Sequence, residues 1–500
     1  MTQTLLPLEE NPWPRPPRRR WSWIVAGVCA VVLLAYGGFQ VVDHLSRCAP
    51  GVARVTVAAA GREECVGISD SYAFEPRFQH VVNALITENE FATAGGEGTY
   101  VTVAFAAGLT NPDGRVVAEL EGAVAGLRRA NRENLVGSKP LIKMVLANMD
   151  SEQTHWQEVT DDLLEMVDGP DRLRAVVGLG LSSDEAVNGM RRLSEAELPM
   201  IADVMTADDI TKKQANGFAR VNPTVGEELA AVAQYVRTTE ERTAEQRSAM
   251  MVTYSEENDR YAAALSNAFK TRFGEHWKRS GRVSNPFSRD PGINFDLIVG
   301  SLCDDDSPDL ILYGGRGKDL PAFIQYLSQR KCHDDEVTIV TGSDAARLLT
   351  DSPENKPAVD ALYSQEKPIS LIYSPLAEPA VLRGGAGQPA EPQLVKLEQT
   401  FRDVGFDPRH LRTGWAIMAH DAVLVAARAI RLAALSNPIP PPRKVRDHIY
   451  LMSPKVNGVQ GASGLIEIDP ETGNRRIERL PVLRLLPRGE PEILGLYPVR

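Results

Sequence analysis

The segment that decides the fold runs from Leu173 to Met205. Residues 174–180 read RAVVGLG, a short apolar, β-branched run ending in glycines, which is typical of a buried parallel strand and a tight turn. Ser182 and Ser183 can cap a following helix, whose apolar residues recur at helical spacing until a proline stops it. Residues 200–205, MIADVM, begin a second apolar strand. The segment therefore predicts a β-α-β unit, with the turn at the carboxyl edge of a sheet, where α/β folds bind ligands.

Strands alternate with helices on both sides of this segment. Upstream, a strand, a helix and a second strand are predicted at 100–105, 116–131 and 141–147. Downstream, strands at 248–254, 309–313 and 337–341 are separated by helices at 262–273 and 320–330. Two sheets built alike, one after the other, indicate a two-lobed α/β protein.

This order of elements resembles the type I periplasmic binding proteins, the branched-chain amino-acid receptor group. The matching motifs are GLGLSS at 178–183, LPMI at 198–201, TADD at 206–209, and FARVNP at 218–223, which is similar to the crossing into the second lobe. Residues 465–474 resemble the family's terminal segment, with Ile468 in its phenylalanine position. The resemblance implies two doubly wound, mainly parallel sheets that are joined by a multi-strand hinge and close on a ligand.

The resemblance also implies how the chain is divided. Residues 43–98 are expected to form a hairpin, a helix and a linker. Lobe 1 is assigned to 99–220 and 365–435, and lobe 2 with the hinge to 221–364 and 436–500. The predicted strand from Ile369 to Tyr373 is expected to return the chain to the first lobe.

The amino-terminal region predicts a membrane anchor. Residues 1–20 are a Pro- and Arg-rich tail, and residues 21–42 form an uncharged, mostly apolar run of the length that a bilayer requires. The arginines before the run place the tail in the cytoplasm and the bulk of the chain outside, so we expect a single-pass protein of the cell membrane. A cleaved signal peptide is disfavoured, because the sequence has no clean cleavage site after the apolar run. A lipoprotein signal at Cys29 is also disfavoured, because the apolar run continues past this cysteine.

Cysteine usage agrees with an extracytoplasmic location. Outside the span the chain has Cys48, Cys65, Cys303 and Cys332, an even number that permits disulfides. Of the three pairings, we favour Cys48 with Cys65, which closes a loop over the predicted hairpin at 52–66, and Cys303 with Cys332, each shortly before a strand of one sheet. Four unpaired buried thiols are the alternative.

Composition and motifs argue against other classes of protein. The net charge of -11, without a large basic domain, makes nucleic acid an unsuitable partner. No Gly-x-Ser-x-Gly elbow occurs, and GGRGKD at 314–319 lacks the spacing of a phosphate loop. The acidic run 304–306 has no glutamate at EF-hand spacing, and Cys332-His333 has no second ligand pair. We therefore predict no enzyme activity, no metal and no cofactor.

One alternative function, a dinucleotide-binding oxidoreductase, is supported by a partial sequence motif. Gly178-x-Gly180-x-x-Ser183, with Asp203 at the end of the next strand, is one residue short of the dinucleotide fingerprint. Ser183 replaces the third glycine, and a soluble nicotinamide cofactor is scarce outside the membrane. This reading is therefore the least favoured.

Loop residues of both lobes are predicted to bind the ligand. Ser182 and Ser183 can take a carboxylate at a helix start, although Asp184 and Glu185 weaken an anion site there and a plain helix cap is the alternative. Hydroxyls of Ser69 or Thr206 can assist, and Asp203, Glu256 or Asp344 can meet an ammonium group. The second lobe completes the set with Tyr254, Asn258, Tyr261 and Arg316.

These observations predict a membrane-anchored extracytoplasmic solute-binding protein. As the resemblance implies, its lobes close on a small, amino-acid-like molecule and present it to an ABC permease. The alternative is a sensor or scaffold ectodomain of a membrane complex, which keeps the fold without a transport role.

Overall fold

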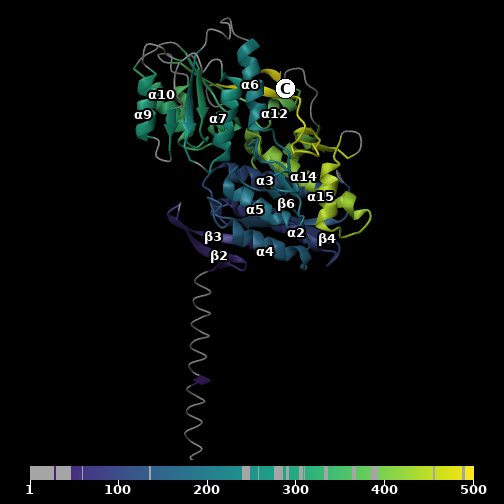
Figure 1. Cartoon of the computed structure of the whole chain (residues 1–500). Helices are drawn as coiled ribbons and strands as arrows, with labels where there is room; N and C mark the ends of the chain where they lie inside the picture. Colours follow the sequence, from purple (N-terminus) through teal and green to yellow (C-terminus); the bar gives the residue numbers. More distant parts are fainter. Residues whose placement is uncertain are drawn as a thin grey trace, which may run out of the picture.

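The computed structural model describes residues 28–29 and 47–500, except residues 59, 135–136, 239–247, 257, 275–284, 289–291, 303–307, 309, 332–335, 363–367, 385–391, 454–456 and 487–489. The chain forms two α/β lobes, each built around a sheet covered by helices (Figure 1). The proposed span at 21–42 lies outside the described residues apart from Val28 and Cys29. Among the described helices, none has the length and apolarity that a bilayer crossing requires.

The first lobe contains a sheet in the order β1-β2-β3-β5-β4-β6-β7-β8. Strands β5, β4, β6, β7 and β8 run parallel, and β3 joins β5 antiparallel. The strands are β1 (Arg47–Ala49), β2 (Val52–Val57), β3 (Arg62–Ser69), β4 (Tyr100–Ala107), β5 (Leu141–Asn148), β6 (Leu173–Gly178), β7 (Met200–Ala202) and β8 (Phe218–Arg220). The parallel core strands β4 and β6 are apolar and buried along nearly their whole length, because helices cover both faces.

Helices from two distant parts of the chain cover this sheet. The amino-terminal part supplies η1 (Pro76–Phe78), α2 (Gln79–Thr93), α3 (Arg115–Arg132), α4 (Trp156–Asp168) and α5 (Asp184–Ser194). The carboxyl-terminal part adds α13 (Pro392–Val404), η5 (Pro408–Thr413), α14 (Trp415–Ala434), α15 (Pro442–Tyr450) and the hairpin β14 (Val459–Gly461) and β15 (Gly464–Ile466). Helices α3 and α14 make the most extensive contact in the molecule, and Figure 1 shows them side by side.

The second lobe contains a sheet in the order β10-β9-β11-β12-β13-β16-β17. The strands are β9 (Ala249–Tyr254), β10 (Asn285–Phe287), β11 (Leu310–Gly314), β12 (Val337–Val340), β13 (Ile369–Tyr373), β16 (Arg479–Leu486) and β17 (Glu490–Pro498). The helices are α6 (Val225–Thr238), α7 (Arg260–Arg272), α9 (Gly292–Ser301), α10 (Leu320–Ser328), η3 (Ser343–Leu349) and α11 (Asn355–Ala361). The first five strands are parallel, and β16 and β17 are antiparallel additions.

Two expectations about the division of the chain are corrected. Strand β13 does not return to the first lobe, because its wholly buried residues pair with β12 on one side and β16 on the other. The return follows β13, through α12 (Pro379–Leu382). Residues 436–500 do not lie wholly in the second lobe either, because α15 packs on α14 and β6, and only β16 and β17 join the second sheet.

The amino-terminal hairpin is confirmed, with β2 and β3 paired from Val52 to Gly67. The predicted disulfide between Cys48 and Cys65 is also confirmed, with the two Cα atoms 5.9 Å apart. Cys303 and Cys332 lie outside the described residues, so their pairing stays a prediction.

Two histidines meet one buried carboxylate where α2, α3 and η5 come together. Glu121 Oε1 lies 2.8 Å from His80 Nε2, and its Oε2 lies 2.6 Å from His410 Nδ1. The hydrogen bond to Glu121 outweighs burial and raises the pKa of His410 above its ordinary value. The protonated form therefore stabilises the fold.

The stability that His410 contributes is expected to depend on pH. Because its pKa is raised in the fold, the contribution is full below the pKa of the unfolded chain and is lost as pH rises through the folded pKa. We expect the His410→Gln variant to lose less than about 1 kcal/mol at low pH, since the side chain is 38% exposed and the pair is screened, and still less at high pH. Urea unfolding of both proteins between pH 5.5 and 8.5 measures this, and a difference that does not change with pH would contradict it.

Candidate functional site: the cleft between the lobes

A cavity of about 390 Å³ lies between the two lobes. The first lobe lines it with residues that follow β4, β5 and β6: Asn111, Pro112, Asp113, Ser151, Glu152, Gln153, Thr154, Leu181, Ser183 and Glu185. The second lobe lines it with residues at or beyond the carboxyl ends of β9, β11 and β12: Tyr254, Glu256, Asn258, Asp259, Arg316, Lys318, Asp344 and Arg347. All these segments follow the carboxyl ends of parallel strands, where α/β sheets bind ligands.

The inner end of the cleft is nearly filled by the protein's own side chains. A cavity of only about 20 Å³ remains there, bounded by Arg115, Thr206, Tyr261, Trp415 and neighbouring residues. Trp415 is buried at the start of α14, and Tyr261 is buried at the start of α7. The space that a ligand can use without rearrangement is therefore the outer, polar part of the cleft.

Arg316 bridges the two lobes at the boundary between these cavities. Its Nε donates to Asp259 Oδ2 over 2.6 Å within the second lobe, and its Nη2 donates to the carbonyl oxygen of Ser182 over 3.2 Å. The guanidinium also lies 4.9 Å from the centre of the Tyr261 ring. Burial lowers the pKa of Arg316, but the neighbouring carboxylates of Asp259 and Asp344 outweigh it, so the pKa is raised and the charge is retained.

Two further arginines of the second lobe form ion pairs with carboxylates of the first. Arg260 Nε donates to Asp184 Oδ1 over 2.6 Å, and the same guanidinium pairs with Asp209. Arg347 Nη1 lies 2.5 Å from Asp113 Oδ2. Because these groups are partly exposed, each pair is worth roughly 0.2–1 kcal/mol. Together they hold the lobes in a closed arrangement.

The predicted residues Ser182, Ser183 and Thr206 all lie on loops of the first lobe. Ser183 Oγ accepts the amide hydrogen of Ala186 and caps α5, as the sequence predicts. Ser182 Oγ accepts the amide hydrogen of Ala207, and Thr206 borders the small inner cavity. The two serine hydroxyls therefore stabilise loops of the first lobe beside the cleft.

The predicted acidic residues have different positions. Asp344 borders both cavities and accepts the amide hydrogen of Gly317 over 2.7 Å. Asp203 is fully buried below the cleft near Arg115 and Glu119, and desolvation, together with the charge of Glu119, raises its pKa well above the ordinary value. Asp203 borders neither cavity.

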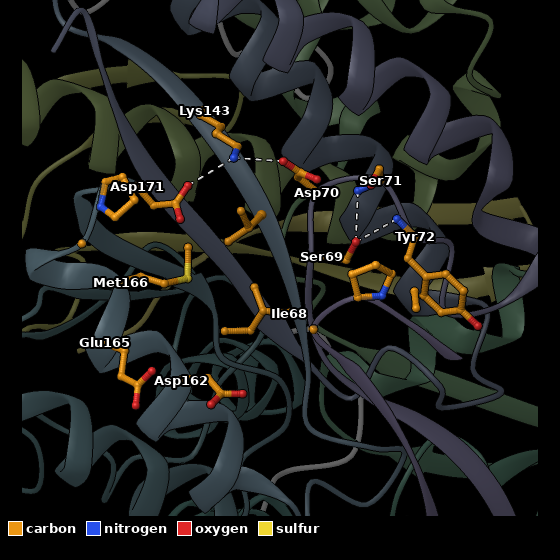
Figure 2. A pocket seen from close by; sticks show the side chains of 16 residues that line it. Ile68, Ser69, Asp70, Ser71, Tyr72, Lys143, Asp162, Glu165, Met166 and Asp171 are labelled. Atoms are coloured by element: carbon orange, nitrogen blue, oxygen red, sulfur yellow. Dashed lines mark hydrogen bonds and ion pairs between the residues drawn. The ribbon is translucent and has the colours of Figure 1, made fainter. Parts of the chain in front are cut away.

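Ser69, another predicted residue, lies away from the cleft. It lines a separate surface pocket of about 660 Å³ beside the hairpin, where its Oγ accepts the amide hydrogens of Ser71 and Tyr72 (Figure 2). Lys143 spans this pocket between Asp70 and Asp171, at 2.9 Å and 3.2 Å. Tyr254, Asn258, Tyr261 and Arg316, by contrast, all reach the cleft or its inner end.

The glycine turn after β6 does not form an open cradle for a pyrophosphate. Gly178 and Gly180 have positive φ angles, of 90° and 73°. The Gln153 side chain lies against the turn: its Nε2 donates to Leu179 O, and its Oε1 accepts the amide hydrogen of Leu181. A Cβ added at Gly180 would lie 2.6 Å from this amide. The turn therefore packs on a first-lobe side chain.

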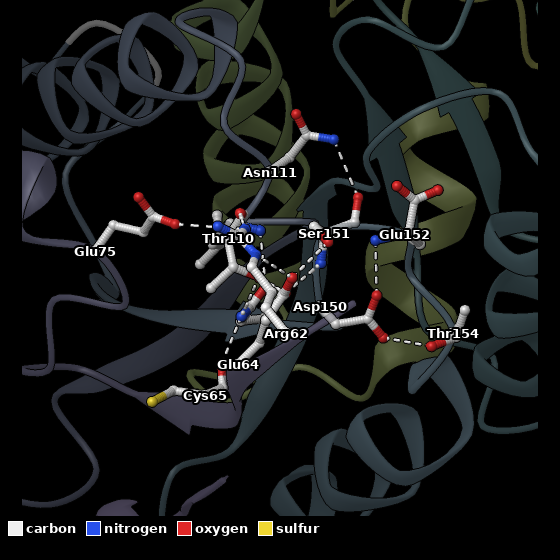
Figure 3. A network of polar contacts seen from close by, with 12 residues as sticks. Arg62, Glu64, Cys65, Glu75, Thr110, Asn111, Asp150, Ser151, Glu152 and Thr154 are labelled. Carbon is white, nitrogen blue, oxygen red and sulfur yellow. Dashed lines mark hydrogen bonds and ion pairs between the residues drawn. The ribbon is translucent and has the colours of Figure 1, made fainter. Parts of the chain in front are cut away.

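A polar network centred on Glu64 supports the first-lobe wall of the cleft (Figure 3). Glu64 lies on β3 and is only 3% exposed. It accepts hydrogen bonds from Thr110 Oγ1, which follows β4, and from Ser151 N and Oγ, which follow β5. Asn111 Nδ2 in turn donates to Ser151 O over 3.0 Å. The disulfide-closed hairpin thereby fixes two loops that line the cleft.

Sequence reasoning missed several cleft residues, among them Asn111, Asp113, Ser151, Lys318 and Arg347. Each follows a strand that the sequence does predict, so the rule that ligand sites lie at carboxyl ends of strands could have found them. Arg260, the arginine that pairs with Asp184, is also missing from the predicted set. Nothing in the sequence indicates which acidic residue lies opposite an arginine of the other lobe.

Comparison with solved structures identifies the class of fold. A leucine-binding protein of Thermotoga maritima is similar over 80% of this chain and 99% of its own, with 17% identity and a TM-score of 0.55. A branched-chain amino acid transporter substrate-binding protein of Streptococcus pneumoniae, in complex with isoleucine, is 16% identical and has a TM-score of 0.58. The similarity covers 80% of this chain and 99% of that protein. A solute-binding protein of an ABC transporter of Rhodopseudomonas palustris, in complex with 3,4-dihydroxybenzoic acid, is 12% identical and has a TM-score of 0.54. The similarity covers 80% of this chain and 98% of that protein.

At these identities the likeness establishes the fold alone. The chain has the two-lobed α/β fold of type I periplasmic binding proteins, and its structural neighbours are substrate-binding proteins of ABC transporters that bind amino acids or aromatic acids. Neither a protein-family model nor a curated protein sequence matches this chain.

Proposed function

We propose that this chain is a membrane-anchored extracytoplasmic solute-binding protein that closes its lobes on a small, amino-acid-like molecule and delivers it to an ABC permease. The observation that carries the proposal is the polar cavity of about 390 Å³ between the lobes, lined by strand-end loops of both sheets. A ligand held there contacts both lobes at once, so its binding energy favours the closed arrangement.

Ligand binding is expected to raise the melting temperature of the full-length protein in detergent. A ligand at 100 times its Kd stabilises the fold by about 2.7 kcal/mol. The test is a thermal-shift screen of L-amino acids, 4-hydroxybenzoate and organic amines, followed by titration calorimetry on each compound that gives a shift. The Tyr254→Ala variant, altered in the cleft wall, should lose the shift. If no compound stabilises the protein, the proposed function is contradicted.

The membrane location is part of the proposal and has its own test. The uncharged run at 21–42, preceded by arginines, supports a single-pass anchor with a cytoplasmic amino terminus. Protease added to intact spheroplasts should degrade the chain beyond the span and leave an amino-terminal tag protected. Complete protection of the chain, or its release from membranes by alkaline carbonate, would contradict the anchor.

A sensor or scaffold role is the second candidate, and one observation favours it. Arg260, Arg316 and Arg347 join the lobes directly, through contacts between the protein's own groups. A protein closed by its own ion pairs can present a fixed surface to a membrane partner. In that case no compound of the screen shifts the melting temperature. The radius of gyration of the protein, measured by X-ray scattering at low salt, is then the same with and without each compound.

A further inference from the structure

The cleft carries an excess of negative charge. Its described lining includes six carboxylate side chains and three cationic ones, a formal balance of -3: Asp113, Glu152, Glu185, Glu256, Asp259 and Asp344 against Arg316, Lys318 and Arg347. The carboxylates come from both lobes, so closure brings like charges together. Such a cavity attracts a positively charged molecule.

Most of the positive charge in the cleft is already paired. Arg347 is bound to Asp113, and Arg316 is bound to Asp259. The third cation of the lining, Lys318, is exposed, and no described carboxylate lies within ion-pair distance of it. An anionic ligand would therefore have to displace an existing ion pair or rely on one exposed lysine.

Two carboxylates of the lining, one on each lobe, are without a cationic partner among the described residues. Glu185 of α5 has only the Asn258 amide, at 3.5 Å. Glu256 lies on the loop after β9, and the described residues place no cation within ion-pair distance of its carboxylate. A cation between the lobes can approach both groups.

The remaining features of the cleft also suit a cation better than an apolar side chain. Tyr254 lines the cavity, and its ring packs on Phe287 with centroids 5.2 Å apart, so it brings to the cleft an aromatic group of the kind that attracts cations. The inner end, with only about 20 Å³ left beside Trp415, has no room for a branched aliphatic chain.

We infer that the ligand of this cleft is an organic cation, a compound with amine or guanidinium groups and a net positive charge. The inference rests on the proposed function, since it names the class of solute that the cleft takes. The ligand's cationic groups lie between Glu185 and Glu256 and against Tyr254. It thereby differs from the leucine, isoleucine and hydroxylated benzoic acids bound by structural neighbours.

The test is titration calorimetry of the full-length protein with five compounds: spermidine, agmatine, L-arginine, L-leucine and 4-hydroxybenzoate. We expect at least one of the cations to bind at least tenfold more tightly than leucine or 4-hydroxybenzoate, and its affinity to fall as salt is raised from 50 to 300 mM. Tighter binding of leucine or 4-hydroxybenzoate overturns the inference but supports the proposed function. Absence of binding by all five, and by the wider screen, overturns both.

Matched variants locate the effect. Glu256→Gln and Glu185→Gln should each weaken binding of the cation about tenfold, equivalent to about 1.4 kcal/mol. Glu165→Gln is the control, because it removes the same charge from the surface pocket beside the hairpin. If all three variants weaken binding of the cation equally, or if none of them weakens it, the assignment of the cation to the cleft is overturned.

Discussion

Replacing Glu64 with alanine is expected to lower the free energy of unfolding by about 3 kcal/mol. The carboxylate is 3% exposed and accepts hydrogen bonds from Ser151 N at 2.8 Å, Ser151 Oγ at 2.6 Å, Arg62 Nε at 2.9 Å and Thr110 Oγ1. Burial by itself would raise the pKa of Glu64, but these hydrogen bonds outweigh it and hold the pKa below its ordinary value. Without the carboxylate, the buried donors lose their acceptor, at roughly 1–3 kcal/mol for each group left unsatisfied.

Urea unfolding and hydrogen exchange measure this effect. The same variant should speed amide exchange at 108–113 and 150–154, the two loops that Glu64 joins, more than at the loop 181–186 of the same lobe. Glu63→Ala is the control: it changes the adjacent residue of β3, whose side chain is 64% exposed, and should cost no more than about 0.5 kcal/mol. Equal destabilisation by the two substitutions would contradict the role of the network.

A second large effect is expected at the contact between α3 and α14. Gly122 and Gly126 let the two backbones approach closely: a Cβ at Gly126 would lie 2.8 Å from His420 O, and one at Gly122 would overlap the carbonyl group of Ala416. The obstructing atoms are backbone, so the helices must separate. We expect Gly122→Ala to destabilise the protein by about 3 kcal/mol, the upper part of the range for overpacked cores.

The matched control for Gly122 lies in another helix. Gly300 of α9 is exposed, and an added Cβ would meet nothing within 4 Å. Gly300→Ala should therefore leave stability unchanged or raise it by up to about 1 kcal/mol, because alanine favours helices. Urea unfolding of both variants tests the pair, and a Gly122→Ala protein as stable as the wild type would show that the helices separate at little cost.

The local elements of this fold could be predicted from the sequence because their signals are local. The hairpin at 52–66, the strand before Gly178 and the cap at Ser183 all follow from residue type and spacing. The sequence could not predict the lobe to which the strand Ile369–Tyr373 belongs. An apolar run shows that a strand is buried, but it does not show which sheet contains the strand. Its partner β16 lies far along the chain, at Arg479–Leu486.

The candidate site was predictable in part for the same reason. Residues placed by the strand-end rule, such as Tyr254 and Arg316, reach the cleft. Ser69 also ends a strand, but β3 pairs antiparallel with β5, so its carboxyl end lies at the opposite edge of the sheet from the carboxyl ends of the parallel strands. The pairing of Arg260 with Asp184 depends on how two lobes approach each other, which residue spacing does not encode.

The packing of α14 on α3 has a consequence for biosynthesis. Arg129 and His420 are hydrogen-bonded across this contact, yet they lie 291 positions apart in the chain. At translation rates of roughly 5–20 residues per second, the α14-facing side of α3 stays uncovered for about 15–60 s, while the parallel strands of the second sheet are being made. A nascent chain with such an uncovered apolar surface needs a chaperone, or export before folding, to avoid aggregation.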